Sequence, residues 1–147
     1  VDGVEEHKKW KGDIETFAGA KAGFPIIADN DLTVAKAFDM LPADAYLPDG
    51  RTPNDSATVR AVFIIGPDKQ LKLSMTYPMT VGRNFAEVLR ALDGLQTSTG
   101  KGVATPANWN VGDDVIIPAT LSDDDAKAKF GDFNKILPYL RTTKAPS

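Results

Sequence analysis

A chain of 147 residues, of which 42% are hydrophobic and 25% charged, has the length and composition of one ordinary globular domain. Its formal net charge of -3 and the lack of a basic block argue against a nucleic-acid-binding domain. Because the sequence has no cysteine, it excludes disulfides, thiolate metal sites and thiol nucleophiles within these residues. A single histidine leaves no histidine-based metal cluster, and no apolar run has the length of a membrane span. We therefore expect a cytoplasmic protein without a membrane span, a metal or a cofactor.

The first forty residues are predicted to contain two helices. Asp2 and Glu5 have the spacing of a capping box, which predicts a helix that begins at Asp2 and ends at Gly23. Its helical periodicity rests on Val4, His7, Trp10, Ile14 and Phe17. After a strand candidate at residues 24–27, a second, short helix is predicted from Leu32, Ala35, Ala37 and Phe38. Residues 43–56, rich in proline and turn formers, are predicted to be a loop.

The middle of the chain is predicted to form two strands and an amphipathic helix. Apart from Arg60, residues 59–65 are a continuous apolar run, which is typical of a strand covered on both faces. A turn at residues 66–69 leads to an antiparallel partner strand at residues 71–77. An amphipathic helix is predicted next from the spacing of Phe85, Val88, Leu89, Leu92 and Leu95. It is expected to end at residues 97–100. This order of elements predicts an α/β layer with a mixed sheet.

The residues beyond Gly100 differ in character and are predicted to form a small α+β extension. Val115 to Ile117 is a short strand candidate, and Ser122 followed by three aspartates is a typical helix start. The predicted organisation is therefore a core at residues 1–100 and an extension at residues 101–147.

Several short strings, taken in order, carry a family resemblance. The strand and turn read Val59-Arg60-Ala61-Val62-Phe63-Ile64-Ile65-Gly66-Pro67-Asp68, and they are followed by Leu71-Lys72-Leu73-Ser74, Tyr77-Pro78 and Gly82-Arg83-Asn84-Phe85. The C-terminal part contains Val103-Ala104-Thr105-Pro106, Trp109, Gly112-Asp113 and Tyr139-Leu140-Arg141, and the N-terminal part Val4-Glu5-Glu6-His7 with Trp10. From Val1 to about Arg141 this pattern resembles the one-cysteine class of the peroxiredoxins.

The resemblance implies a thioredoxin-like fold and a thiol-dependent peroxidase. Such enzymes reduce hydroperoxides through a cysteine thiolate that becomes a sulfenic acid, which an external thiol reductant then recycles. The family's cysteine lies in a Pro-x-x-x-Thr-x-x-Cys motif that is absent from this sequence. Since the chain also begins with Val-Asp-Gly and not with Met, we expect an N-terminally truncated fold, with the cysteine upstream and this chain inactive alone.

Arg60 and Arg83 are the candidate catalytic residues. A charge in an apolar strand must be paired or lie at the mouth of a site, because burying it unpaired is costly. The resemblance implies that Arg60 points at the cysteine pocket and holds the thiolate and the peroxide oxygens; the alternative is an exposed arginine at a strand start. Arg83 lies just before a helix, where the helix dipole disfavours a cation, which suggests a partner there. Its alternative is a solvent-exposed loop arginine.

Four further features are given mainly structural roles. His7, on the apolar stripe of its helix, is expected to be a packed or half-exposed residue and not a catalyst. Asp68 is a good turn former, although the resemblance leaves open the aspartate of a phospholipase activity credited to some family members. The aspartates 123–125 are expected at a helix N-terminus, and Trp109 is expected to anchor the extension.

Two classes of function remain open. The chain is either part of a peroxidase or an inactive thioredoxin-like fragment that only dimerises or binds a partner. For either class the resemblance implies a homodimer, in which the strand 71–77 pairs with its copy and the extension from Val103 reaches over the partner. The residues expected at this contact are Leu71, Leu73, Met75 and Tyr77.

Overall fold

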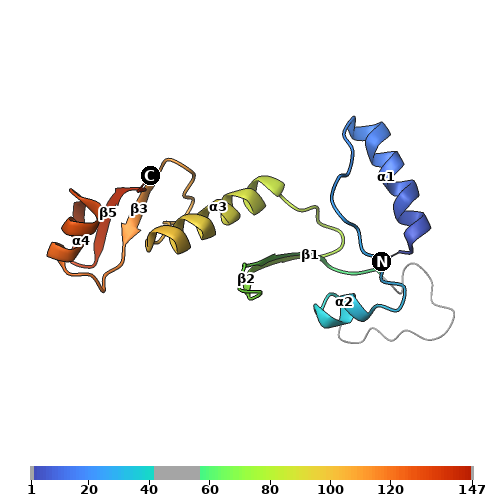
Figure 1. Ribbon diagram of the computed structural model, residues 1–147, viewed down its shortest axis with the longest axis horizontal. Helices are drawn as coiled ribbons and strands as arrows, with labels where there is room; N and C mark the ends of the chain where they lie inside the picture. The colour runs from blue at the N-terminus through green and yellow to red at the C-terminus, as the bar shows by residue number, and fades with distance from the viewer. Residues whose placement is uncertain (1, 42–56, 147) are drawn as a thin grey trace. The chain divides into compact units, whose positions relative to one another are not determined.

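The computed structural model describes residues 2–41 and 57–146, and within these residues the chain forms four helices and five strands (Figure 1). They divide into two units: unit 1 contains the residues up to 62 and residues 74–83, and unit 2 contains residues 63–73 and those from 84 onward. The loop predicted at residues 43–56 lies outside the described residues. In the part of the chain that is described, no helix is both long and apolar enough to cross a membrane.

Unit 1 begins with helix α1, Val4–Ala18, whose ends differ from those predicted. The expected capping box is wrong, because Gly3 is the N-cap and no side chain bonds to the helix start. The helix ends at Gly19 and not at Gly23, because Gly19 has the left-handed conformation (φ 66°) that suits a C-cap glycine. The strand predicted at residues 24–27 is also wrong, since among the described residues no strand lies there.

The second predicted helix is confirmed as α2, Thr33–Ala37. Asp29, four residues before Thr33, binds the first turn of this helix with its side chain. Its buried carboxylate accepts hydrogen bonds from the backbone N–H of Val34 at 2.9 Å and of Ala35 at 2.8 Å. These bonds satisfy two of the backbone donors that a helix N-terminus leaves without partners. Leu32, the N-cap residue of α2, is fully buried.

Strands β1, Arg60–Ile65, and β2, Leu71–Tyr77, form a two-stranded sheet and confirm the predicted strand pair. The turn between them is closed by two backbone hydrogen bonds of 2.9 Å between Gly66 and residues 69 and 70. The expectation that β1 is covered on both faces is wrong: its four middle residues are only partly buried, and Ile65 is 52% exposed. In residues 2–41 and 57–146, β1 has β2 as its one strand neighbour.

In unit 2, helix α3, Phe85–Lys101, carries the chain toward the extension. The side chain of Asn84 caps it by accepting a hydrogen bond from Glu87 N–H at 3.2 Å. The predicted closure at residues 97–100 is wrong, because the helix continues to Lys101 and ends at Gly102, which has a left-handed φ of 65°. Glycine at this position ends a helix more strongly than the preceding serine and threonines do.

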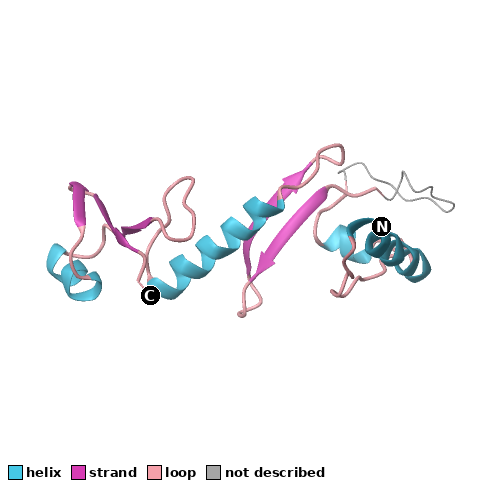
Figure 2. Ribbon diagram, turned by 90° about the horizontal axis from the view of Figure 1, so that it is seen from above, coloured by secondary structure: helices cyan, strands magenta, loops and turns pink. Residues whose placement is uncertain are grey.

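The extension consists of β3, Asp114–Ile117, α4, Asp123–Phe130, β4, Asn134–Leu137, and β5, Leu140–Lys144 (Figure 2). Strand β5 is central in an antiparallel sheet of order β3-β5-β4. The predicted strand 115–117 and the helix start at Ser122 are confirmed, whereas β4 and β5 were not predicted. Together with the hairpin and the helices, this sheet confirms the α/β class.

The core of the extension forms around Trp109, which is 2% exposed and packs with Val103 and Val115. Its indole N–H donates to the carbonyl of Asp113 at 3.2 Å. From α3, the Arg90 guanidinium donates to the Trp109 carbonyl at 3.2 Å while its other nitrogens bind Glu87. Trp109 is therefore an anchor of the extension, as predicted.

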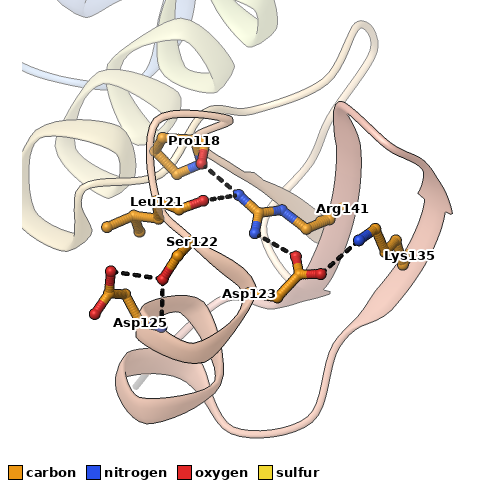
Figure 3. A network of polar contacts seen from close by, with 7 residues as sticks. All are labelled: Pro118, Leu121, Ser122, Asp123, Asp125, Lys135 and Arg141. Carbon is orange, nitrogen blue, oxygen red and sulfur yellow. Dashed lines mark hydrogen bonds and ion pairs between the residues drawn. The ribbon is translucent and has the colours of Figure 1, made fainter.

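A buried arginine connects β5 to the start of α4 (Figure 3). Arg141 is 3% exposed, and its Nη1 donates to Asp123 Oδ1 at 2.8 Å while its Nη2 donates to the carbonyls of Pro118 and Leu121 at 2.8 Å each. Lys135 of β4 binds the second oxygen of Asp123. These two cations, Lys135 first, lower the pKa of the Asp123 carboxyl below its usual value. The first of the three aspartates thus connects three elements at a helix N-terminus.

We expect Arg141→Met to destabilise the extension, because it removes a buried charge and the donor to two carbonyls. Losses of this kind cost about 2–4 kcal/mol. Arg141→Lys should restore part of the stability, since an ammonium cannot reach three acceptors with a fixed fork. Urea unfolding followed by tryptophan fluorescence measures the effect, with Lys127→Met in α4 as an exposed control. An unfolding midpoint equal to that of the control would show that the buried contacts of Arg141 contribute nothing.

Candidate active site

The two predicted arginines line the same pocket of unit 1. Arg60 is the first residue of β1, and Arg83 lies in the segment between β2 and α3, one residue before the helix cap Asn84. The pocket has a volume of about 450 Å³. Its lining residues are Asp2, Met40, Ala57, Thr58, Val59, Arg60, Ala61, Met79 and Arg83. Two residues 23 positions apart in the sequence are therefore brought to one site by the β1–β2 hairpin.

Arg60 is held at the edge of the pocket by the segment that carries Arg83. Its Nε donates a hydrogen bond of 2.6 Å to the backbone carbonyl of Met79, and its side chain is exposed. The bond uses one of the five N–H donors of the guanidinium and fixes the direction of the others. Arg60 is therefore both an exposed arginine at a strand start and a residue that lines a pocket.

The chemistry of the pocket is that of charge stabilisation. Two guanidinium groups supply positive charge and planar sets of donors, which suit an anion or oxygens that gain negative charge. Asp2, Met40 and Met79 are among the other residues of the lining. The sequence has no cysteine, so this chain supplies no thiolate to the pocket. The arrangement can bind and polarise a substrate or a nucleophile brought to it.

His7 and Asp68 lie outside this pocket. His7 is partly buried on α1 and lines a separate pocket of about 320 Å³ together with Trp10, Phe24 and Ile26. This position confirms the prediction of a half-exposed helix residue. Asp68 lies in the β1–β2 turn, where it accepts from Gln70 N–H at 3.2 Å and pairs with Lys72. The hydrogen bond from Lys72, and then that from Gln70, lowers the pKa of the Asp68 carboxyl.

Sequence reasoning missed two residues that line the pocket beside Arg60. Met79 contacts Arg60 through its backbone carbonyl, which no side-chain pattern indicates. Met40 reaches the pocket because its carbonyl accepts a hydrogen bond from Val59 N–H at 2.9 Å, directly before β1. The sequence offered one signal for these neighbours: a charge in an apolar strand such as Arg60 was predicted to need a partner.

Two family models match the chain. The model of the AhpC/TSA family covers residues 1–74, and the model of the C-terminal domain of 1-Cys peroxiredoxin covers residues 94–132. The first match contains Arg60, and the second contains Trp109 and residues 101–132 of the extension. The division at about residue 100 that we predicted is not tested by these matches, because the second begins inside α3.

Curated relatives cover nearly the whole chain. "Peroxiredoxin PRX1, mitochondrial" of Saccharomyces cerevisiae is 51% identical over 148 residues, which are 99% of this chain and 55% of that protein. "Peroxiredoxin-6" of Gallus gallus is 46% identical over 156 residues, which are 99% of this chain and 68% of that protein. The chain thus spans a little over half to two thirds of the length of these relatives.

A solved structure shows the same fold. The structure of the yeast mitochondrial 1-Cys peroxiredoxin has a TM-score of 0.83 and 50% identity, and it covers 98% of this chain and 67% of that chain. The thioredoxin-like fold is therefore confirmed. With the two family matches and the relatives above, it shows that the chain belongs to the one-cysteine class of the AhpC/TSA peroxiredoxins.

Proposed function

We propose that this chain is the arginine-bearing part of a thiol-dependent peroxidase that reduces hydrogen peroxide and organic hydroperoxides. The nucleophile is the family's cysteine, supplied by residues outside this chain; we refer to the longer protein that carries it as the cysteine-bearing protein. The observation that carries the proposal is that Arg60 and Arg83 line the same pocket in a chain of this family.

The proposed reaction uses the pocket to stabilise charge. The cysteine thiolate attacks one oxygen of the hydroperoxide, the O–O bond breaks, and the sulfur becomes a sulfenic acid. The leaving oxygen departs as water or an alcohol once it has taken a proton. Arg60 and Arg83 stabilise the thiolate before the attack and the negative charge on the oxygens during it. The positive charges also lower the pKa of the thiol, which raises its thiolate fraction at neutral pH.

An external thiol completes the cycle by reducing the sulfenic acid. The solved yeast relative is described by a "thiol resolving mechanism" that runs "via glutathione/thioredoxin systems". We infer the same class of reductant, a small or protein thiol, for the cysteine-bearing protein. Stopped-flow oxidation of that protein by hydrogen peroxide, with Arg60 present or replaced by Ala, tests the assignment. Equal rates would reject the role of the pocket.

A second candidate is an inactive thioredoxin-like fragment that dimerises or binds a partner. The observation that favours it is the lack of cysteine in the sequence. The two candidates predict different source proteins, because only the first requires a longer chain with a reactive thiol.

The cytoplasm stays the expected location from composition, although the yeast relative is mitochondrial by its printed name.

We further propose a homodimer formed around β2. Leu73, Met75 and Tyr77 are partly buried and Leu71 is 56% exposed, while the alternating Lys72, Ser74 and Thr76 are exposed. In the described part of the chain β2 has one strand neighbour, so its second edge is open for pairing with a copy. In a two-fold contact residue i meets residue j of the copy and j meets i, so residues close to the axis lie near their own copies.

We expect Leu73→Lys or Met75→Lys to convert this dimer to monomers, because each brings like charges together across the axis. Sedimentation velocity at micromolar concentration measures the change. Thr16→Lys adds the same charge on the exposed surface of α1, outside the proposed contact, and is the control that should remain a dimer. A monomer before any substitution would contradict the proposed contact for this chain.

A further inference from the structure

The chain has three methionines, and their surroundings differ. Met79 is 51% exposed and lines the arginine pocket, with its backbone carbonyl bound by Arg60. Met40 also lines the pocket but is partly buried. Met75, in β2, is partly buried and is not among the lining residues. Met79 is thus both exposed and part of the lining of the pocket that Arg60 and Arg83 share.

We propose that Met79 is a modification site, oxidised to methionine sulfoxide by the hydroperoxide that the arginine pocket admits. The inference rests on the proposed function, since it requires a hydroperoxide at Arg60 and Arg83. It adds a second sulfur to the site, which reacts even in a chain without cysteine.

The reaction is balanced without any further reagent. A lone pair of the Met79 sulfur attacks one oxygen of the hydroperoxide, an S–O bond forms, and the O–O bond breaks. The sulfur loses two electrons, and the leaving oxygen takes up both electrons and the proton from the attacked oxygen. The products are the sulfoxide and one molecule of water or alcohol. Because the leaving oxygen carries negative charge as the O–O bond breaks, neighbouring guanidinium groups accelerate this step as they do the attack by a thiolate.

Oxidation would also change the pocket. The sulfoxide replaces an apolar thioether by a polar group with a hydrogen-bond-accepting oxygen. This oxygen lies in a pocket whose donors are the guanidinium groups of Arg60 and Arg83. It therefore competes with the hydroperoxide oxygens for the same donors. The modification is reversible by methionine sulfoxide reductases, so the pocket can be restored.

The experiment treats the 147-residue chain with excess hydrogen peroxide and measures sulfoxide at each methionine by peptide mapping over time. Met75 is the internal reference outside the pocket lining; it is also less exposed than Met79 and lies at the proposed dimer contact, so the arginine variants separate charge stabilisation from exposure. We expect Met79 to react about three to ten times faster than Met75, because stabilisation of one charge by a guanidinium is worth up to about a factor of ten.

Variants separate the arginine effect from simple exposure. Arg60→Gln and Arg83→Gln should each slow oxidation at Met79 about threefold or more, with Met75 unchanged. Lys9→Gln removes a charge from an exposed position of α1 and should change neither rate. Circular dichroism identifies a variant that loses its fold, and the second arginine variant then decides. Met79 no faster than Met75, or a Met79 rate that ignores both arginines, overturns the inference. If Arg60→Ala nevertheless slows thiol oxidation in the cysteine-bearing protein, the proposed function stands although the inference about Met79 fails.

Discussion

The 147-residue chain should not turn over hydrogen peroxide in the presence of dithiothreitol. It has no cysteine, and neither its single histidine nor its carboxylates attack an O–O bond as a thiolate does. Oxidation of its three methionines to sulfoxides consumes three equivalents of peroxide, which is a stoichiometric and not a catalytic loss. The measurement is the peroxide remaining over time, compared with a sample that contains the reductant alone.

Turnover should return when the family's cysteine-bearing segment precedes the chain. The matched control is the same longer protein with that cysteine replaced by serine, which keeps the fold and removes the nucleophile. We expect the serine variant to be as inactive as the 147-residue chain. Thiol-dependent turnover by the pure chain, continuing beyond three equivalents, would show that another group performs the chemistry.

In the cysteine-bearing protein, Arg60→Ala should slow the reaction of the thiolate with hydrogen peroxide by about 10²–10³-fold, the usual cost of removing one preorganised donor to developing charge. The thiol pKa should rise as well, because a positive neighbour that favours the thiolate is lost. Arg60→Lys should recover only part of the rate, since an ammonium keeps the charge without the planar fork. Stopped-flow oxidation across a pH series gives the rate and the thiol pKa together.

Arg83→Ala should have the same direction and a smaller effect, since Arg60 belongs to strand β1 whereas Arg83 lies in the irregular segment between β2 and α3. Lys36→Ala, on the exposed surface of α2 in the same unit, is the control for a general loss of charge. If Arg60→Ala leaves both the rate and the thiol pKa unchanged, Arg60 is simply an exposed arginine at the start of a strand.

The elements that sequence reasoning located correctly carry their own local signals. The β1–β2 hairpin has a continuous apolar run, a glycine-proline turn and an alternating return strand. The start of α4 has a serine cap whose hydroxyl accepts from Asp125 N–H at 3.0 Å. Arg60 could be singled out because one charge interrupts an apolar strand. That Arg83 lines the same pocket follows from the hairpin, which returns the chain to the start of β1.

The elements that were missed depend on partners distant in the sequence. Residues 24–27 have an apolar composition, but a strand requires a neighbour to accept its hydrogen bonds. Strands β4 and β5 contain polar and charged residues without clear alternation, and they form because β5 pairs with β3 on one side and β4 on the other. Arg141 is buried because Asp123, 18 residues away, neutralises it. Met79 joined the site through a backbone carbonyl, which composition does not show.

The most direct test of the central claim is made on the source protein isolated whole. Its intact mass and its peroxidase activity are measured before and after alkylation of its thiols. We predict a mass above the 15.8 kDa of this chain, at least one alkylated cysteine, and complete loss of peroxide turnover on alkylation. A mass of 15.8 kDa with no thiol, or peroxide turnover that survives alkylation, would contradict the assignment of this chain to a thiol-dependent peroxidase.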